Sequence, residues 1–295
     1  PYIQQTSDSV LAQESSNFEL IVVNDGSTDR TAENAAKSDP RVRVIEQENS
    51  GVCVARNRGI AEAKGRFIAL LDHDDFWFPN KLSTQLRIFS EQPDVGVVYG
   101  DFIRWDAQPD GRFPAPGIYS KRAALPGEDT EYSGWIYHQM LLDSWVLTST
   151  ALTRAEVFAN CGRFDESLPY SEDWELWLRV SRKYKFVKQR RASCLYRVHA
   201  VQGSRVPRKF NYESALLENT VAKYGYCGPD GSQVNKKAFK AALSRAHGRF
   251  AYLHLKNGDL NTARRSFWLA WRNQPTSFAA TKLLLGSLLG LRGRP

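Results

Sequence analysis

FELIVVNDGS (residues 18–27) and FIALLDHDD (residues 67–75) are the two stretches that decide the fold of this 295-residue chain. Each is a short apolar run that stops at a cluster of polar, turn-forming residues, as a buried strand does when it leaves a sheet. Helix-like segments at 29–37 and 52–64 lie between them, separated by a further apolar run at 42–45. This alternation predicts an α/β fold with a central, mostly parallel sheet covered by helices on both faces.

The remaining sequence divides into three parts. A helix followed by the strand Val95–Tyr99 continues the α/β pattern. From Asp101 to Trp145 the chain is rich in Pro, Gly, Trp and Tyr and has no periodicity, which predicts a loop-rich insertion that shapes a pocket. Order returns with a strand or short helix around Val146–Phe158, and Trp174–Tyr184 is predicted as a helix. We predict an α/β domain at residues 1–204 and a helical region at residues 205–295.

Composition indicates the class of protein. Hydrophobic residues make up 42% of the chain, which is enough for one large domain and a smaller appendage. The four cysteines lie too far apart for a metal site or a disulfide framework, which fits a reducing compartment. No apolar run reaches the roughly 18 residues needed to span a bilayer, and no signal peptide opens the chain. We therefore expect a cytoplasmic protein.

Charge is divided unevenly along the chain. Residues 1–204 hold 24 Lys and Arg against 28 Asp and Glu, whereas residues 205–295 hold 16 against 4. This asymmetry suggests two functional units, with the basic one facing an anionic surface. Nucleic acid and anionic lipid are both open as that surface, and so is a solvated helical surface that is simply basic.

Asp72, Asp74 and Asp75 place three carboxylates within four residues at the end of a predicted strand. In an open α/β sheet, ligands bind beyond the carboxyl ends of the strands. Carboxylate oxygens clustered in this way suit Mg²⁺ or Mn²⁺, which would in turn hold a diphosphate. An acidic turn that caps the following helix is the alternative interpretation.

Four blocks follow one another in the chain: SVLAQESSNFELIVVNDGSTDRT from residue 9, NSGVCVARNRGIAEAKGRFIALLDHDDFWFPNKL from residue 49, GRFDESLPYSEDWELWLRV from residue 162, and YRVHAVQGS from residue 196. In order and spacing they closely resemble family-2 glycosyltransferases, over about two thirds of the chain. The resemblance implies a GT-A type nucleotide-diphospho-sugar transferase fold and metal-dependent sugar transfer.

The resemblance implies a set of donor-binding residues. Asp25 would hydrogen-bond the nucleobase, and Arg56 and Asn57 would line the nucleotide side of the site. Arg56 has an alternative role, which is to pair with a carboxylate and brace its helix. Asp72 would face the ribose, and Asp74 would bind the metal, Mg²⁺ or Mn²⁺, directly.

Three further residues extend this site. His199 in YRVH matches a downstream histidine that completes the metal and diphosphate site in several relatives. Arg197 would contact the diphosphate or lie on the surface. Asp75 is expected as a charge at a helix N-terminus rather than as a ligand.

Glu172 and Asp173 open the helix that contains DWELWLRV. Acids at a helix start are favoured by the macrodipole without any catalytic role. The resemblance instead implies Asp173 as the catalytic base and Glu172 as its orienting neighbour. Trp174 and Trp177 on the same helix are candidates to stack an acceptor sugar, with burial in the core as the alternative for at least one of them.

Two features lie outside the resemblance. The strand that usually precedes the first helix of the family is missing before Pro1, so we expect a truncated chain or another segment in its place. Residues 239–275 resemble one tetratricopeptide-like helical hairpin. The apolar run LLLGSLLGLRGR from residue 283 is expected as an interfacial helix or as core.

The resemblance implies a metal-dependent, inverting hexosyltransferase, which we expect to act in cell-surface polysaccharide synthesis. Its donor would be a nucleotide sugar, most simply a UDP-sugar, and its acceptor a saccharide or a lipid-linked glycan. Peripheral contact of the basic region with the inner face of the plasma membrane is expected, and a nucleic-acid partner is not. The alternatives are a catalytically impaired scaffold or binding protein of the same fold, and a nucleotidyltransferase.

Overall fold

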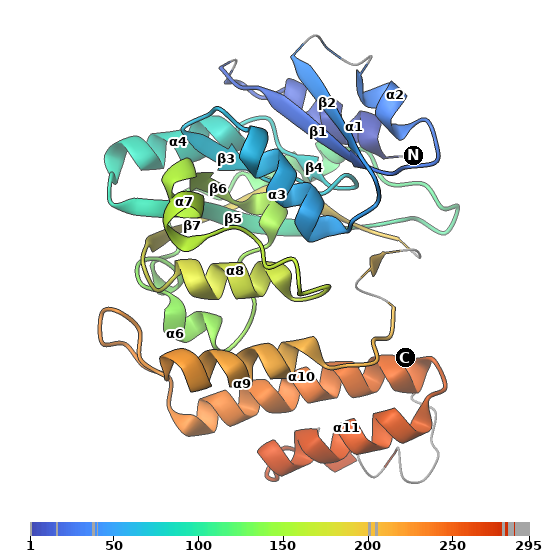
Figure 1. The fold of residues 1–295 in the computed structure, drawn as a ribbon, viewed down its shortest axis with the longest axis vertical. Coiled ribbons are helices and arrows are strands. Elements are labelled where there is room, and N and C mark those ends of the chain that lie inside the picture. The colour runs from blue at the N-terminus through green and yellow to red at the C-terminus, as the bar shows by residue number, and fades with distance from the viewer. Residues whose placement is uncertain are drawn as a thin grey trace. The chain divides into compact units, whose positions relative to one another are not determined.

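The structure is a computed structural model that describes residues 2–15, 17–36, 39, 41–199, 202, 203, 206–278, 281, 282 and 286. The chain forms two compact units, shown in Figure 1. The sheet unit contains Pro1–Ile136 and Ser144–His199, and the helical unit contains Tyr137–Asp143 and Ala200–Pro295. The change of unit therefore follows His199, and a short segment from the middle of the sequence also belongs to the helical unit.

The strands of the sheet unit form two sheets among the described residues. The first is the parallel pair β1 (Leu20–Asp25) and β2 (Val42–Gln47). The second has five strands in the order β3 (Phe67–Ala69), β6 (Leu152–Arg154), β5 (Val95–Asp106), β7 (Lys185–Val198) and β4 (Phe76–Trp77).

The predicted α/β class is confirmed, but the large sheet is mixed rather than mostly parallel. Only β5 and β7 run parallel in it. The short strand β6 lies between β3 and β5 and runs against both, and β4 runs against β7. Strand β6 therefore separates β3 from β5, and these two strands do not pair with each other.

Helices cover the sheets. In the sheet unit they are α1 (Ile3–Leu11), α2 (Thr31–Ala36), α3 (Val52–Glu62), α4 (Lys81–Glu91), α5 (Ser120–Ala123), α7 (Ala155–Cys161) and α8 (Glu172–Val180), with 3-10 turns η1 (Pro116–Tyr119), η2 (Thr130–Tyr132) and η3 (Thr148–Thr150). In α4, Leu82, Ile88 and Phe89 recur at helical spacing and are buried, which is why this segment is an amphipathic helix against the sheet.

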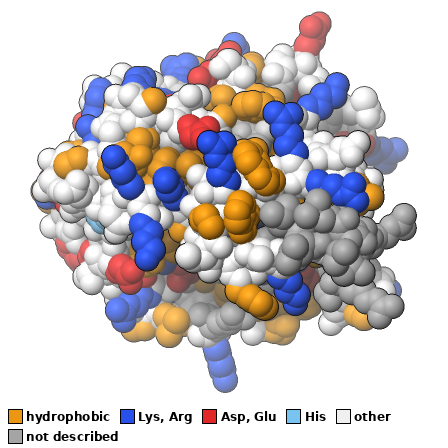
Figure 2. All heavy atoms as spheres, turned by 90° about the horizontal axis from the view of Figure 1, so that it is seen from below, with side chains coloured by type: hydrophobic (Ala, Val, Ile, Leu, Met, Phe, Trp, Pro, Cys, Tyr) orange, Lys and Arg blue, Asp and Glu red, His pale blue; other side chains and the backbone are white. Residues whose placement is uncertain are grey.

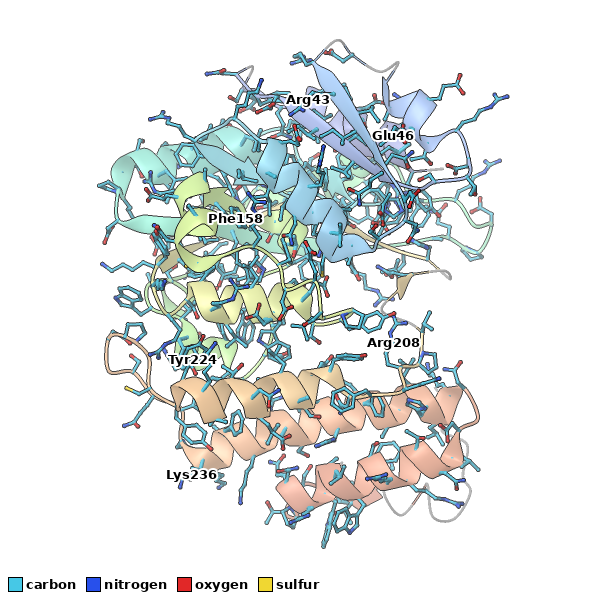
Figure 3. The ribbon with its side chains drawn as sticks, in the orientation of Figure 1. Arg43, Glu46, Phe158, Arg208, Tyr224 and Lys236 are labelled. Carbon is cyan, nitrogen blue, oxygen red and sulfur yellow. The ribbon has the colours of Figure 1, made fainter. Side chains whose placement is uncertain are left out.

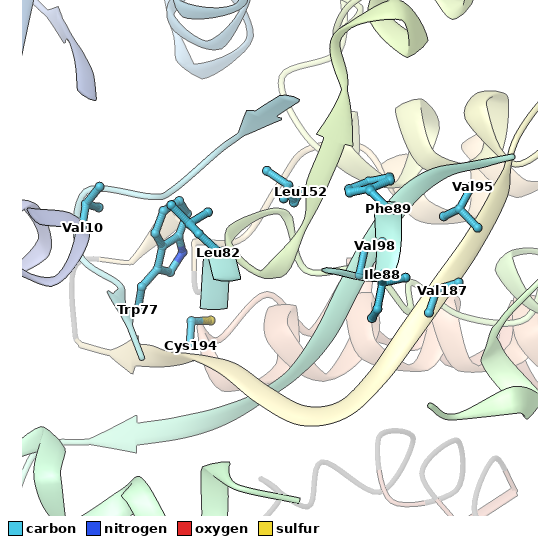
Figure 4. Close-up of a cluster of buried hydrophobic side chains, with 10 residues drawn as sticks. All are labelled: Val10, Trp77, Leu82, Ile88, Phe89, Val95, Val98, Leu152, Val187 and Cys194. Atoms are coloured by element: carbon cyan, nitrogen blue, oxygen red, sulfur yellow. The ribbon is translucent and has the colours of Figure 1, made fainter. Parts of the chain in front are cut away.

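One core cluster joins α1, α4 and the large sheet (Figure 4). Its members are Val10, Trp77, Leu82, Ile88, Phe89, Val95, Val98, Leu152, Val187 and Cys194. The first half of β5 is buried on both faces, which fits its nearly continuous apolar sequence. This packing involves β3, which precedes the turn of Asp72, Asp74 and Asp75, and β7, which precedes His199.

The loop-rich insertion predicted from Asp101 begins later, because β5 continues to Asp106. The insertion contains η1, α5 and η2. Its last part runs along β7, with bridges from Glu128 to Gln189 and from Gly134 to Phe186. It therefore lies beside the first half of β7.

The helical unit contains α6 (Tyr137–Met140), α9 (Tyr212–Tyr224), α10 (Lys236–Lys256) and α11 (Leu260–Asn273). The last three helices begin at capping side chains, Asn211, Asn235 and Asp259, each of which accepts a backbone hydrogen bond three residues on. The segment of α6 is tied to this unit because the Tyr137 hydroxyl donates to the Gly225 carbonyl at 2.8 Å.

Helices α10 and α11 form the predicted hairpin. A three-residue turn joins them, and Gly258 adopts φ +84° in it, a conformation that favours glycine. Ala251, Leu255, Ala263 and Phe267 form their shared core. Its assignment as a tetratricopeptide-like repeat stays a prediction.

The predicted interfacial run from residue 283 lies outside the described residues except for Gly286. Among the helices that the structure describes, none combines the length and the apolar character needed to cross a membrane.

Candidate functional site

Arg56 joins two acidic motifs that are far apart in the sequence. Its Nη2 lies 2.7 Å from Oδ1 of Asp72, and its Nη1 lies 2.8 Å from Oε1 of Glu172. The three side chains come from α3, from the loop after β3 and from the first position of α8. Burial alone would lower the pKa of Arg56, but the Asp72 and Glu172 carboxylates raise it above its usual value. The alternative role of Arg56 as a partner of carboxylates is thus observed.

Asp75 is buried in the turn after β3. Its Oδ2 accepts a hydrogen bond from the Ser149 hydroxyl at 2.6 Å, and its Oδ1 accepts one from the Arg197 backbone at 3.0 Å. Burial, and then the neighbouring Asp72 charge, raise the pKa of Asp75 to about 8. The expectation of a helix N-terminal charge is wrong, because β4 follows and α4 begins only at Lys81.

Asp74 and His199 lie together at the end of β7. The Nε2 of His199 is 2.8 Å from Oδ2 of Asp74, and Asp74 is only 8% exposed. Within the described residues, Nδ1 of His199 has no hydrogen-bond partner. This pair connects the second and fourth blocks of the sequence in one place.

The Asp74–His199 pair fits a divalent cation that is completed by a ligand. No group of three or more His, Cys, Asp and Glu side chains in the described part of the chain could hold a metal alone. One carboxylate and one imidazole nevertheless suit Mn²⁺, and a carboxylate suits Mg²⁺, when substrate phosphates and water supply the other ligands. The donor set is therefore compatible with the predicted metal.

Arg197 braces the acidic turn from within the core, at 1% exposure. Its Nε donates to the Asp74 carbonyl at 2.6 Å, and its guanidinium lies 4.0 Å from the Trp105 ring centroid and 4.4 Å from that of Tyr2. Burial lowers the pKa of Arg197 below its usual value. The expected surface position of Arg197 is therefore wrong, and its contact with a diphosphate stays a prediction.

Glu172 and Asp173 are the first two residues of α8. Ser171 before them has φ +60°, and in the described part of the chain it is the one non-glycine residue with positive φ. Such a conformation costs free energy and is typical of functional sites. Burial, followed by the Glu172 charge, raises the pKa of Asp173 to about 6, although Arg56 acts in the opposite direction. Asp173 therefore has a pKa in the range of a general base.

Trp174 and Trp177 belong to the core. Trp177 is fully buried and packs edge-on against Phe186 with ring centroids 6.2 Å apart. Trp174 is 3% exposed. Neither indole has a free face for a sugar ring in this structure, because α8 turns this side toward the sheet.

Asp25 holds the loop before α3. Its carboxylate accepts hydrogen bonds from the backbone N–H of Ser50 and Gly51 and from the Gln47 amide, at 2.8 to 2.9 Å. Burial would raise the pKa of Asp25, but these hydrogen bonds together lower it. The adjacent Asn24 donates to Glu46, which is labelled in Figure 3. A nucleobase that contacts Asp25 would therefore bind a carboxylate that already accepts hydrogen bonds from the loop.

Asn57 bonds the loop before α8. Its amide donates to the Phe164 carbonyl and to Glu166, both at 2.9 Å, and its oxygen accepts from the Phe164 backbone N–H. The structure thus gives Asn57 a part in positioning α8. Its predicted contact with the nucleotide stays a prediction.

Sequence reasoning missed Ser149. Its hydroxyl donates to Asp75, and its oxygen accepts a hydrogen bond from the Asp72 backbone N–H at 3.2 Å. It lies in η3, 74 residues from Asp75 in the sequence. The surrounding TSTALTR has no chemical signature, so only the fold reveals this role.

Comparison with known proteins gives the family. Residues 1–140 match the family described as glycosyl transferase family 2. The uncharacterized glycosyltransferase EpsJ of Bacillus subtilis is 30% identical over 246 residues, covering 80% of this chain and 70% of EpsJ. Chondroitin synthase of Pasteurella multocida is 29% identical over 188 residues, covering 63% of this chain and 18% of that protein. The chain spans between 31% and 61% of the length of the uncharacterized glycosyltransferases that it matches in four Rickettsia species.

Solved structures show the same fold. S. aureus TarS 1-349 in complex with UDP-GlcNAc superposes with a TM-score of 0.61 at 16% identity, covering 99% of this chain and 86% of that one. The mannosyltransferase PcManGT of Pyrobaculum calidifontis, with GDP-Man and Mn2+, gives 0.55 at 21% identity, covering 99% and 77%. The predicted GT-A fold is confirmed. The likeness to EpsJ, with the family match over residues 1–140, shows that the chain belongs to glycosyl transferase family 2.

Proposed function

We propose that this chain transfers a sugar from a nucleotide-diphosphate donor to a saccharide or lipid-linked acceptor, with inversion at the anomeric carbon. The observation that carries the proposal is the ion-paired link from Asp72 through Arg56 to Glu172, beside an Asp173 of raised pKa. This link joins the acids of the donor side to those of the predicted base in one site.

Asp173 acts as the general base in this proposal. The acceptor oxygen forms a bond to the anomeric carbon while the bond to the donor diphosphate breaks, and the hydroxyl proton passes to the Asp173 carboxylate. The nucleoside diphosphate leaves with the bonding electron pair. With a pKa of about 6, Asp173 is ionised at neutral pH and is a stronger base than an ordinary aspartate. Glu172, held by Arg56, positions the start of α8.

The donor side of the proposal consists of Asp25, Arg56, Asn57 and Asp72. They lie on α3 and at the ends of β1 and β3. TarS was solved with UDP-GlcNAc and PcManGT with GDP-Man, which supports a nucleotide-sugar donor here. We favour a UDP-hexose.

Asp74 and His199 would hold the divalent metal, Mg²⁺ or Mn²⁺. The Mn2+ in PcManGT supports this assignment. When bound, the metal would neutralise negative charge on the leaving diphosphate. Arg197 and Ser149 keep the turn that carries Asp74 in place through the contacts described above.

The biological product is proposed to be a cell-surface polysaccharide. Chondroitin synthase and hyaluronan synthase of Pasteurella multocida, both 29% identical to this chain over 188 residues, are named for making polysaccharides. The chain matches only 18% of each of them, so their activities are carried over as a proposal.

The helical unit is proposed to contact an anionic membrane surface from the cytoplasmic side. On α11, Trp268 is 45% exposed, with Arg265 and Arg272 exposed on the same helical stripe. Lys236, labelled in Figure 3, is exposed at the start of α10. Figure 2 shows Lys and Arg interspersed with apolar side chains on the face it displays, a pattern typical of interfacial binding.

The proposed function is tested by a donor screen. Thermal unfolding of the chain is measured with UDP-, GDP- and dTDP-sugars, each with and without Mn²⁺. We expect one nucleotide class to raise the melting temperature in a metal-dependent manner, since binding to the native state stabilises it. No shift with any donor would contradict the proposal.

A further inference from the structure

The acceptor of an inverting transfer approaches from the side of the base, opposite the leaving diphosphate. Trp174 and Trp177 cannot contact it in this structure, because both are buried. We therefore expect acceptor contacts from other side chains on the sheet face that packs against α8.

Strand β5 has an interruption on this face. Val97, Tyr99, Ile103 and Trp105 are each at most 5% exposed, whereas the side chain of Asp101 between them is 52% exposed. The extra residues of the nearby bulges belong to β7, so the alternation of β5 is unbroken and these five share one face. The elements that cover this face of β5 therefore leave the Asp101 side chain accessible to solvent.

A chain of contacts shows that this is the face of α8. Trp177 packs on Phe186, and Phe186 packs edge-on against Tyr99 with ring centroids 6.3 Å apart. The Tyr99 hydroxyl donates to the Tyr132 carbonyl at 2.9 Å. Tyr132 and α8 consequently flank the same side of β5 and β7.

The groups around Asp101 are held in fixed positions. The ammonium of Lys188 lies 3.0 Å from Asp101 Oδ1, 3.2 Å from Asp129 Oδ2 and 4.8 Å from the Tyr132 ring centroid. The Tyr132 ring in turn lies against Trp145, with centroids 4.3 Å apart and planes at 39°. Both rings are partly exposed.

This cluster is connected to the acidic turn through the backbone. Trp145 comes four residues before Ser149, whose hydroxyl donates to Asp75. Four residues span at most about 14 Å even when fully extended. Trp145 therefore lies within about 14 Å of Ser149, which is hydrogen-bonded to the turn that carries Asp72 and Asp74.

We propose that Asp101, Asp129, Tyr132, Trp145 and Lys188 form a subsite for a pyranose ring of a saccharide acceptor. The partly exposed Trp145 ring, which packs on Tyr132, contacts the C–H face of the sugar, the carboxylates accept hydrogen bonds from its hydroxyls, and the ammonium donates to them. The inference rests on the proposed function and names the part of the site that holds the acceptor.

The test uses the full chain with UDP and Mn²⁺ present and compares Trp145→Ala and Asp101→Asn with the unchanged protein. Saturation-transfer NMR measures the binding of chitotetraose, mannotetraose and a hyaluronan tetrasaccharide. Asp101→Asn preserves shape at an exposed position, so it keeps the test valid if Trp145→Ala fails to fold. Phe102→Ala, next to Asp101 on the opposite face of β5, is the control.

At least one oligosaccharide should bind, and Trp145→Ala should weaken it about 10-fold, as expected for loss of an aromatic stacking partner. Asp101→Asn should weaken it several-fold, while Phe102→Ala and the affinity for UDP stay unchanged. If UDP binds but no oligosaccharide does, or if both variants bind normally, the subsite is overturned. If none of UDP, GDP and dTDP binds with Mn²⁺, the proposed function fails instead.

Discussion

The sheet unit and the helical unit use charge in opposite ways. In the sheet unit, the buried charges have fixed partners: Arg56 lies between Asp72 and Glu172, and Arg197 lies among aromatic rings. In the helical unit, exposed cations outnumber acids, and Lys236 and Lys237 occupy the first turn of α10, where the macrodipole disfavours positive charge. The paired charges of the sheet unit hold individual side chains in position. The exposed cations of the helical unit instead create a positive electrostatic potential at its surface.

The largest expected effect concerns the metal pair. Asp74→Ala removes the carboxylate proposed to bind the metal directly, so the Mn²⁺-dependent stabilisation by a donor should be lost. Calorimetric titration of the donor with and without Mn²⁺ measures this. Asp94→Ala, an exposed aspartate paired with Lys185, is the control and should bind normally. Retained metal-dependent binding in Asp74→Ala would contradict the assignment.

The next effect is on the rate. Asp173→Asn keeps the shape of the side chain but cannot take a proton, so transfer should fall by about 10² or more, with donor affinity within a few-fold. Radiolabelled transfer and calorimetry separate the two quantities. Asp165→Asn, an exposed acid in the loop before α8, should retain activity. Turnover close to normal in Asp173→Asn would move the role of base to another group.

A third effect concerns stability. Arg56→Gln leaves Asp72 and Glu172 without their cation, and breaking a buried ion pair of this kind costs about 3 kcal/mol. Urea unfolding measures the change. Arg87→Gln removes an exposed pair with Glu91 and should cost only a few tenths of a kcal/mol. Equal costs at the two arginines would remove the distinction between fixed and exposed charges.

The smallest effect is expected in the helical unit. Lys236→Gln should weaken binding to anionic vesicles about fivefold, because one basic residue near such a surface contributes on the order of 1 kcal/mol. Sedimentation with neutral and anionic vesicles, at low and high salt, measures it. Binding that ignores lipid charge and salt, or no binding at all, would leave this unit with a different partner.

Local patterns predicted the parts of the fold that local chemistry determines. The strand before Asp25 and the strand before Asp72 follow from short apolar runs that end in turn residues, and the hairpin of α10 and α11 follows from its spacing of small and aromatic residues. The four motif blocks also identified the acidic residues of the site from the sequence alone.

Long-range packing determined what the sequence could not show. Arg56 meets Glu172 across 116 positions, and Ser149 meets Asp75 across 74. The burial of Arg197 depends on Tyr2 and Trp105, which no spacing rule connects to it. Likewise, the burial of Trp177 depends on which side of α8 faces the sheet.

The central claim is that Arg56 couples the donor-side acids to the base, and the pH dependence of turnover tests it most directly. In the unchanged chain, kcat should fall as the pH drops through about 6, because Asp173 becomes protonated there. The positive charge of Arg56 lowers the pKa of Asp173, so Arg56→Gln should shift this midpoint to higher pH. An upward shift supports the account, and a midpoint that is the same in both proteins would contradict it.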